Sequence, residues 1–214
     1  MQPDPRLTQA LKVAGENKKE LLKVLNYYRE SDSLKYEAAC FLIRNMPYYG
    51  SYEGEELYKY LRYFEGYSKT EKNAQEFVDS LKRADGEFNR KKLTYRQDIV
   101  TIDSAFLVNH IEWAFKVWLE QPWGKNISFD DFLEYILPYR IANEPLSFYQ
   151  KELYEKYNPM LDSFRSSAGA ANPLLAAQVL LDTLKKNNYR YTGLFPQGPH
   201  IGPATLRWNT GSCT

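Results

Sequence analysis

Apolar residues recur at helical spacing along most of the chain, and this periodicity constrains the fold more than any other feature. The i, i+3, i+4, i+7 pattern of an amphipathic helix occurs in three separate stripes. These are Leu21, Val24, Leu25 and Tyr28; Leu57, Tyr60, Leu61 and Phe64; and Ala74, Phe77, Val78 and Leu81. No stretch alternates with period two for long enough to predict a sheet. The pattern therefore predicts an all-α fold.

Two further segments are apolar on more than one face, which is typical of helices that pack between neighbours. One is "SLKYEAACFLIRNM" at 33–46, which Pro47 would end. The other is the longest predicted helix, from about 102 to 120, whose apolar side chains lie nearly all round it. We expect the 102–120 helix to lie at the centre of a core.

Polar residues that cap helices mark where several helices begin. The candidate N-caps of the helices above are Asp32 or Ser33, Thr70, and Thr101 or Asp103. Ser128 and Asp131 have the spacing of a capping box. Asn172 followed by Pro173 is a strong start signal. Further helices are therefore predicted after Ser128, over about 146–157 and from Pro173.

The segments divide into two helical regions and a tail. Residues 1–84 are predicted to form helical hairpins, and residues 101–188 a helical core around the long helix, in one compact unit with 1–84. The charged, aperiodic residues 85–100 are predicted to be a loop that could include a short extended piece, and the small-residue run at 166–172 a linker. Residues 189–214 carry four Gly and three Pro, which predicts an irregular connector. The predicted architecture is a multi-helix bundle or a set of orthogonal helical hairpins with an irregular Gly/Pro-rich C-terminal tail.

Charge and hydropathy argue against two classes of partner. Lys and Arg number 28 and Asp and Glu 27, for a net charge of +1, so no global field attracts nucleic acid or an anionic membrane. The basic run "RKKLTYR" at 90–96 is typical of a solvated surface. The longest apolar run, at 38–43, is too short to span a bilayer, so no transmembrane segment is predicted. The first residues also lack the charged and apolar regions of a signal peptide.

The sequence around the two histidines gives little indication of a metal-binding or catalytic role. Neither His110 nor His200 has a Cys, His or carboxylate at metal-ligand spacing, so no metal site is predicted. His110 is predicted to be a locally bonded helix residue and His200 a loop residue. No P-loop, dinucleotide fingerprint or nucleophile elbow occurs, so no cofactor is predicted. Arg140 and Glu144 are predicted to form an ion pair that pins a turn, in preference to a paired site in a cleft.

The two cysteines differ in context. Cys40 lies in an apolar helical pattern and is predicted to be a small buried hydrophobe. Cys213 follows loop and cap residues in "NTGSC". A helix starting there would place its thiol in the first turn, where the helix dipole favours the thiolate. Judged from the residues alone, Gly-x-Cys is a weak signal, and a free terminal thiol is the favoured interpretation.

Three stretches resemble the N-terminal part of bacterial transglutaminase-like proteins, which are typically exported proteins or surface lipoproteins. They are "ENKKELLKVLNYYRESDSLKYEAACFLIRNMPYY", "TIDSAFLVNHIEWAFKVWLEQPWGKNISFDDFLEYILPYRIANEPL" and "GPATLRWNTGSC". The most specific pieces are "AACFLIRNMPYY", "LPYRIANEPL" and the final "GSC". In that group a helical region leads through a Gly/Pro-rich connector into a papain-like transglutaminase core, which begins with the nucleophilic Cys.

The resemblance implies that Cys213 occupies the nucleophile position and that its His and Asp partners lie downstream of Thr214. Neither His110 nor His200 matches the family's motif. The chain would then be the accessory helical domain, inactive by itself, of an enzyme for acyl transfer or amide hydrolysis. The implied partners are the downstream catalytic domain and a protein or peptide substrate. The implied location is the periplasm or the cell surface.

Two alternatives come from other functional classes. Aromatic residues make up 15% of the chain, which suits a freestanding helical module that binds protein or glycan through exposed aromatics, with Cys213 incidental. An independent enzyme built around a carboxylate such as Glu144 has little support in the sequence.

Overall fold

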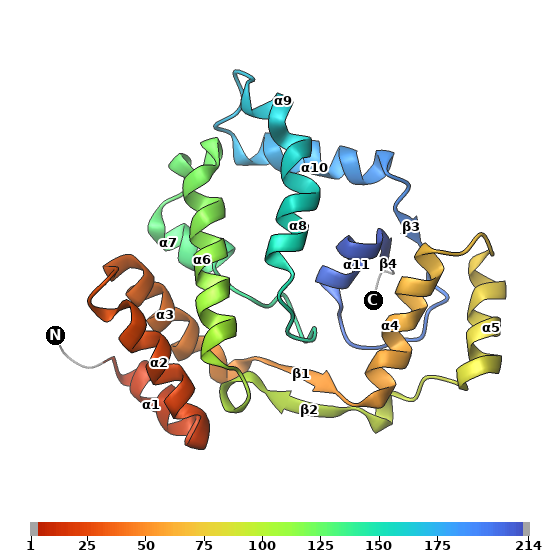
Figure 1. The fold of residues 1–214 in the computed structure, drawn as a ribbon, viewed down its shortest axis with the longest axis horizontal. Coiled ribbons are helices and arrows are strands. Elements are labelled where there is room, and N and C mark those ends of the chain that lie inside the picture. The colour runs from red at the N-terminus through yellow and green to blue at the C-terminus, as the bar shows by residue number, and fades with distance from the viewer. Residues whose placement is uncertain (1–3, 212–214) are drawn as a thin grey trace. The chain divides into compact units, whose positions relative to one another are not determined.

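The structure is a computed structural model that describes residues 4–211 (Figure 1). It is 67% helical and has two small two-stranded sheets, which confirms the predicted all-α fold. The helices are α1 (Pro5–Val13), α2 (Lys18–Arg29), α3 (Ser33–Asn45), α4 (Glu55–Ser68), α5 (Ala74–Asp85), α6 (Ser104–Glu120), α7 (Phe129–Asp131), α8 (Gln150–Tyr157), α9 (Asp162–Arg165), α10 (Pro173–Lys186) and α11 (Gly202–Trp208). The strands are β1 (Gly50–Glu53), β2 (Thr94–Gln97), β3 (Arg190–Tyr191) and β4 (Thr210–Gly211).

The chain folds into two compact units, each assembled from three separate segments. Unit 1 comprises the described residues of Met1–Gly50, Arg96–Ala142 and Ser163–Ala176. Unit 2 comprises those of Ser51–Tyr95, Asn143–Asp162 and Ala177–Thr214. Each unit therefore draws on the N-terminal and on the central part of the sequence, and neither is a continuous stretch of chain.

The core of unit 1 lies between α2, α3 and α6, which contact one another. The apolar stripe predicted for α2 is its buried face. α6 is buried on more than one side, as its composition predicts; its buried residues include Phe106, Leu107, Ile111, Ala114 and Phe115. Fully burying one such side chain contributes about 1.5–3 kcal/mol, so these three helices carry much of the stability of the unit.

Most predicted helix starts are confirmed at the atomic level. Asp32 Oδ1 accepts a hydrogen bond from Lys35 N at 3.0 Å and caps α3. Asp103 Oδ1 accepts one from Phe106 N at 2.7 Å and caps α6. Ser128 and Asn172 also cap their helices, with hydrogen bonds from Asp131 N to Ser128 Oγ (3.1 Å) and from Leu174 N to Asn172 Oδ1 (2.9 Å). The Asp131 carboxylate accepts from Ser128 Oγ at 2.7 Å, and not from the Ser128 backbone N–H as a full capping box requires.

Two local predictions are corrected, and one helix was not predicted. The cap of α5 is Asn73, whose Oδ1 accepts from Glu76 N at 2.9 Å, and not Thr70. The helix predicted from about residue 146 begins only at Gln150. α1 was not predicted, although Asp4 caps it and Pro5 occupies its first position, which are ordinary start signals.

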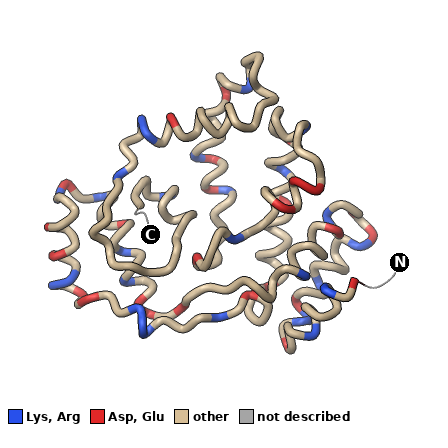
Figure 2. Tube along the Cα trace, turned by 180° about the vertical axis from the view of Figure 1, so that it is seen from behind, with Lys and Arg blue, Asp and Glu red and all other residues tan. Residues whose placement is uncertain are grey.

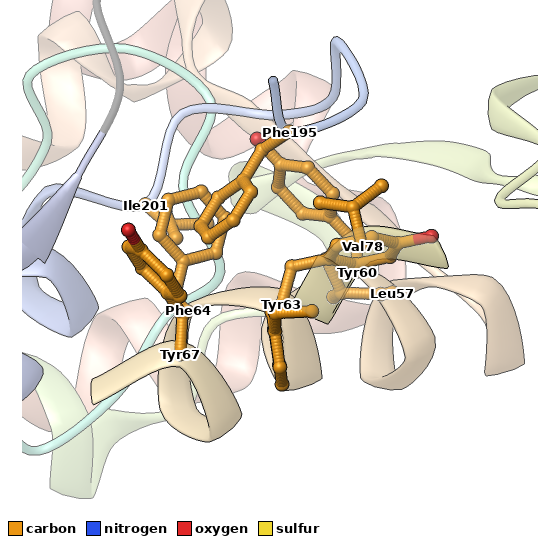
Figure 3. Close-up of a cluster of buried hydrophobic side chains, with 9 residues drawn as sticks. Leu57, Tyr60, Tyr63, Phe64, Tyr67, Val78, Phe195 and Ile201 are labelled. Carbon is orange, nitrogen blue, oxygen red and sulfur yellow. The ribbon is translucent and has the colours of Figure 1, made fainter. Parts of the chain in front are cut away.

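The core of unit 2 is an aromatic cluster on α4 (Figure 3). Helix α4 contributes Leu57, Tyr60, Tyr63, Phe64 and Tyr67, and α5 contributes Phe77 and Val78. Phe195, from the C-terminal segment, lies among them, with its ring centroid 4.8 Å from that of Phe64 in edge-to-face contact. The C-terminal segment is thus part of the core of this unit.

The Gly/Pro-rich segment is irregular over 192–201 and then forms α11 and β4. Its path runs very close to the core: a Cβ at Gly198 would lie 2.6 Å from the Tyr60 ring. Glycine is therefore required there for the backbone to pass.

Basic and acidic residues are interspersed along the trace (Figure 2). Several form ion pairs one helical turn apart, such as Lys69 with Glu65 at 2.6 Å and Lys116 with Glu120 at 2.9 Å. Such exposed pairs contribute about 0.3–0.5 kcal/mol each. These pairs bring opposite charges together on the helix surfaces, in keeping with the net charge of +1.

Candidate functional site

The predicted nucleophile, Cys213, lies outside the described residues, but the segment that leads to it is described up to Gly211. This segment consists of α11, a left-handed turn at Asn209 (φ 49°) and β4. Its contacts in unit 2 therefore bear on how the chain approaches Cys213.

The ammonium of Lys156, on α8, holds the C-terminal end of α11. It donates hydrogen bonds to the carbonyl oxygens of Leu206 (2.7 Å) and Arg207 (2.9 Å) and to Asn209 Oδ1 (3.0 Å). The neighbouring Tyr157 hydroxyl donates to the same Leu206 oxygen at 2.8 Å. A cation on the last carbonyls of a helix is favoured by the helix dipole. Burial lowers the pKa of Lys156 from its usual value.

Strand β4 is buried and paired. It lies parallel to β3, with Arg190 opposite Thr210 and Tyr191 opposite Gly211. Thr210 is 0% exposed. A Cβ at Gly211 would lie 2.2 Å from the Tyr189 hydroxyl, so a larger residue at this position would have to displace that side chain. The last described residues before Cys213 are therefore fixed by packing and pairing.

Strand β3 is in turn tied to the end of α4 through Arg190. Its guanidinium carbon lies 3.8 Å from the centroid of the Tyr67 ring. It donates to the carbonyl oxygens of Tyr67, of Thr70 (2.7 Å) and of Lys72 (3.2 Å). The side chain thus stacks on an aromatic ring and donates to one carbonyl in the last turn of α4 and to two in the loop that follows it.

A hollow of about 520 Å³ opens between these anchored elements of unit 2. Its walls come from the end of α4, the turn between α10 and β3, and the turn between α11 and β4. Trp208 forms one wall and also lines a small, mostly apolar pocket that contains Glu144, Ile201 and Arg207.

His110 is buried in α6 and has a structural environment. Its Nε2 donates to the carbonyl oxygen of Leu137 at 2.6 Å, and its ring stacks on Phe106 with centroids 6.2 Å apart. Burial lowers its pKa to about 4. The imidazole is therefore neutral near pH 7, as a locally satisfied core residue should be.

His200 and Cys40 also have identifiable environments. The exposed His200 lies in the irregular segment, where its backbone N donates to Asn143 Oδ1 at 2.9 Å. Cys40 is half-buried on α3, and burial raises the pKa of its thiol. The Cys40 thiol is therefore not activated as a nucleophile, because a reactive thiol needs a lowered pKa.

Arg140 pairs with Asp98, which the sequence did not suggest. Arg140 Nη2 donates to Asp98 Oδ1 at 2.6 Å, its Nε donates to Oδ2, and both side chains are almost fully buried. The Tyr139 hydroxyl adds a third bond to Asp98 Oδ2 at 3.1 Å. Such a bidentate buried pair is a specific structural element. No local sequence pattern predicts a partner 42 positions away.

Other residues of interest were also missed by sequence reasoning. Asn188 and Asn209 are the described non-glycine residues with positive φ, at 53° and 49°, and both line the hollow. A signal was present, because Asn is the residue that most readily adopts this conformation after glycine. The anchoring role of Lys156 had no comparable signal.

Two searches of the described part of the chain were negative. Residues 4–211 contain no group of three or more His, Cys, Asp or Glu side chains placed to hold a metal ion. In the same range, no helix combines the length and the apolar character needed to cross a membrane. Comparisons of the chain with models of protein families, with curated proteins and with solved structures found no match.

Proposed function

We propose that this chain is the N-terminal helical region of a transglutaminase-like cysteine enzyme, and that unit 2 anchors the segment leading to the nucleophile, Cys213. The observation that carries the proposal is the burial of Thr210 and Gly211 in β4, together with the hydrogen bonds from Lys156 to the end of α11. A frayed tail would have no such contacts. The resemblance of "GPATLRWNTGSC" to the family motif is the second support.

In the proposed parent enzyme, the Cys213 thiolate attacks an amide carbonyl, ammonia or an amine leaves, and a thioester forms. An amine or water then attacks the thioester and releases the thiolate. A His acting as general base and an Asp that orients it complete this chemistry. We propose that both follow Thr214, since His110 donates to Leu137 and His200 is bonded to Asn143. The chain alone is therefore expected to be inactive.

The test measures the pKa of the Cys213 thiol, from the rate of alkylation by iodoacetamide as a function of pH. A Cys40→Ala background removes the other thiol, and Cys213→Ala in that background gives the blank. We expect a thiol pKa near the ordinary value of about 8.5 in this chain and a lowered one in a longer product of the same gene. Equal values in both proteins would count against the nucleophile role.

The downstream codons of the source gene provide an independent check. A helix-forming segment directly after Cys213, followed by a His and an Asp on strand-like segments, would support the proposal. A stop codon after Thr214 would refute it. By the same resemblance we place the protein in the periplasm or at the cell surface; a signal sequence ahead of Met1 in the gene would support this, and none would count against it.

A second candidate function is a helical module that binds protein or glycan through exposed aromatics. Several tyrosines favour it because most of each side chain is exposed, among them Tyr48 (80%), Tyr58 (72%) and Tyr135 (79%). Surface tyrosines of this kind are frequent in binding sites because they present a large amphipathic ring. The test uses Tyr→Ala variants at these positions in a chain that carries Cys213→Ala. Weaker binding of a glycan or protein ligand by these variants would distinguish this function from the first.

A further inference from the structure

We infer that the hollow beside Trp208 is a binding site for a neutral saccharide. It lies wholly within unit 2 and has a volume of about 520 Å³. This is within the range of about 300–1,000 Å³ that is usual for small-molecule sites. The inference does not depend on the proposed role of Cys213.

The polar side chains that line the hollow are mostly neutral amides. Asn187, Asn188 and Asn209 all line it. Within residues 4–211, the side chains of Asn187 and Asn188 make no hydrogen bond to protein groups. Each carboxamide can both donate and accept, which is what a sugar hydroxyl requires of its partners. These groups are therefore available to a ligand rich in hydroxyls.

The amide of Asn209 is oriented in advance. Its Oδ1 accepts hydrogen bonds from Lys156 Nζ at 3.0 Å and from the Tyr157 hydroxyl at 3.2 Å. An ammonium can only donate, so the oxygen must face Lys156 and the two Nδ2 donors remain free on the other side of the amide. Because these contacts already order the amide, ligand binding to its donors costs little further conformational entropy.

Trp208 supplies the aromatic surface of the site. The residue is half-buried, and it packs against the aromatic cluster of unit 2 while also lining the hollow. An indole anchored in this way offers a rigid apolar surface for the C–H face of a sugar ring. The residue thus combines with the amides to match both the polar edge and the apolar face of a saccharide.

The charges of the hollow disfavour an anionic ligand. Its cation, Arg190, is already committed to the carbonyls of Tyr67, Thr70 and Lys72. Its carboxylate, Glu71, makes no ion pair or hydrogen bond with the described residues. An exposed carboxylate would repel a phosphate or an acidic peptide, whereas it can accept hydrogen bonds from two adjacent hydroxyls.

An apolar peptide is a poorer match than a saccharide. The lining contains Ser, Thr, Glu, Asn, Arg and Trp, and no aliphatic side chain among the described residues. A peptide side chain such as Leu would bury its surface against the indole alone. The lining therefore favours a ligand that makes many hydrogen bonds and one aromatic contact.

The test titrates the full chain, carrying Cys213→Ala, with chitobiose, cellobiose and maltose, and detects binding by saturation-transfer NMR and calorimetry. We expect at least one disaccharide to bind, and Asn187→Ala with Asn188→Gly to weaken it about tenfold. Glycine keeps the left-handed backbone at 188, so this change removes the amide without straining the turn. Trp208→Phe keeps an aromatic side chain in the core and is expected to weaken binding as well.

The matched control compares two exposed carboxylates, one in the hollow and one outside it. Glu71→Ala removes a hydrogen-bond acceptor from the hollow and should weaken saccharide binding, whereas Glu30→Ala, at an exposed carboxylate of unit 1, should leave it unchanged. Absence of binding to all three sugars would overturn the inference. Binding that is insensitive to the hollow variants, or that responds equally to Glu30→Ala, would also overturn it. Because each variant carries Cys213→Ala, these outcomes leave the test of the nucleophile role unaffected.

Discussion

Individual residues in this protein owe their properties to burial, and His110 shows this most clearly. Its imidazole lies inside unit 1, donates to the Leu137 carbonyl and stacks on Phe106. Desolvation disfavours the charged form of a buried histidine, and it lowers the pKa of this one from 6.5 to about 4. The protonation of His110 is therefore coupled to the free energy of unfolding and not to a catalytic step.

The first prediction concerns the pH dependence of that coupling. Between about pH 6.5 and pH 4, the unfolded chain holds a proton on His110 that the folded chain does not. The free energy of unfolding must then fall as the pH falls, by on the order of 3 kcal/mol over this interval. His110→Gln can still donate to Leu137 but cannot titrate. Urea unfolding at a series of pH values should show this loss in the wild type and not in the variant.

The control for this experiment is His200→Gln. His200 is exposed in the irregular segment, so its substitution should leave the acid-dependent loss unchanged. Carboxylates that titrate in the same interval contribute equally to all three proteins and cancel in the comparison. Identical pH profiles for the wild type and His110→Gln would contradict the prediction.

At the scale of elements, α11 depends on its neighbours for its existence. It has seven residues, which is too short for a helix to be stable in isolation. Its last carbonyls accept from Lys156 on α8, and Arg207 Nε donates to both carboxylate oxygens of Glu152, also on α8, each at 2.8 Å. Helix α8 therefore supports α11 and the turn at Asn209 that follows it.

The second prediction is that Lys156→Met destabilises unit 2 by about 2 kcal/mol. The change removes the ammonium donor from the Arg207 carbonyl, and it leaves the Leu206 carbonyl and Asn209 Oδ1 to share the single Tyr157 hydroxyl. Lys151→Met, on the same helix, is the matched control. Lys151 is 70% exposed and its nearest carboxylate is 3.8 Å away, so its loss should change stability by less than about 0.5 kcal/mol. Urea unfolding of both variants gives the comparison, and equal effects would show that Lys156 is not an anchor.

At the scale of the whole molecule, the two units have separate aromatic cores. Phe132 in unit 1 is 0% exposed and stacks on Trp118, with centroids 4.4 Å apart. Phe195 in unit 2 is 5% exposed and lies among Tyr63, Phe64 and Tyr67. Each ring is the centre of its own cluster.

The third prediction uses these two rings as reciprocal probes. Phe132→Ala and Phe195→Ala should each cost about 3–5 kcal/mol in the unit that loses the ring. In hydrogen exchange, we expect Phe132→Ala to reduce amide protection in α2, α3 and α6. Phe195→Ala should reduce it in α4 and α5. A uniform loss of protection along the chain in either variant would show that the two units unfold as one.

The helices were largely predictable, because their signals are local. An apolar stripe repeats every three or four residues, and a cap such as Asp32, Asp103 or Asn172 acts within three residues of itself. The errors were local too: Asn73 and Thr70 are both acceptable caps, and only the chain path shows that Asn73 is used. The π-helical turn at Phe132–Ile136 has no sequence signature that separates it from an α-helix.

The sequence by itself determined that this protein is helical, which faces of its main helices are buried, and that Cys213 follows a Gly/Pro-rich segment. Only the tertiary structure decided that Arg140 pairs with Asp98, that Arg190 reaches Tyr67 across 123 positions, and that Thr210 is buried. The reason is physical. Periodicity and capping arise from contacts within one or two helical turns, whereas these pairings depend on the path of the whole chain. The hollow beside Trp208 belongs to the second kind, since its walls come from three segments that only the fold brings together.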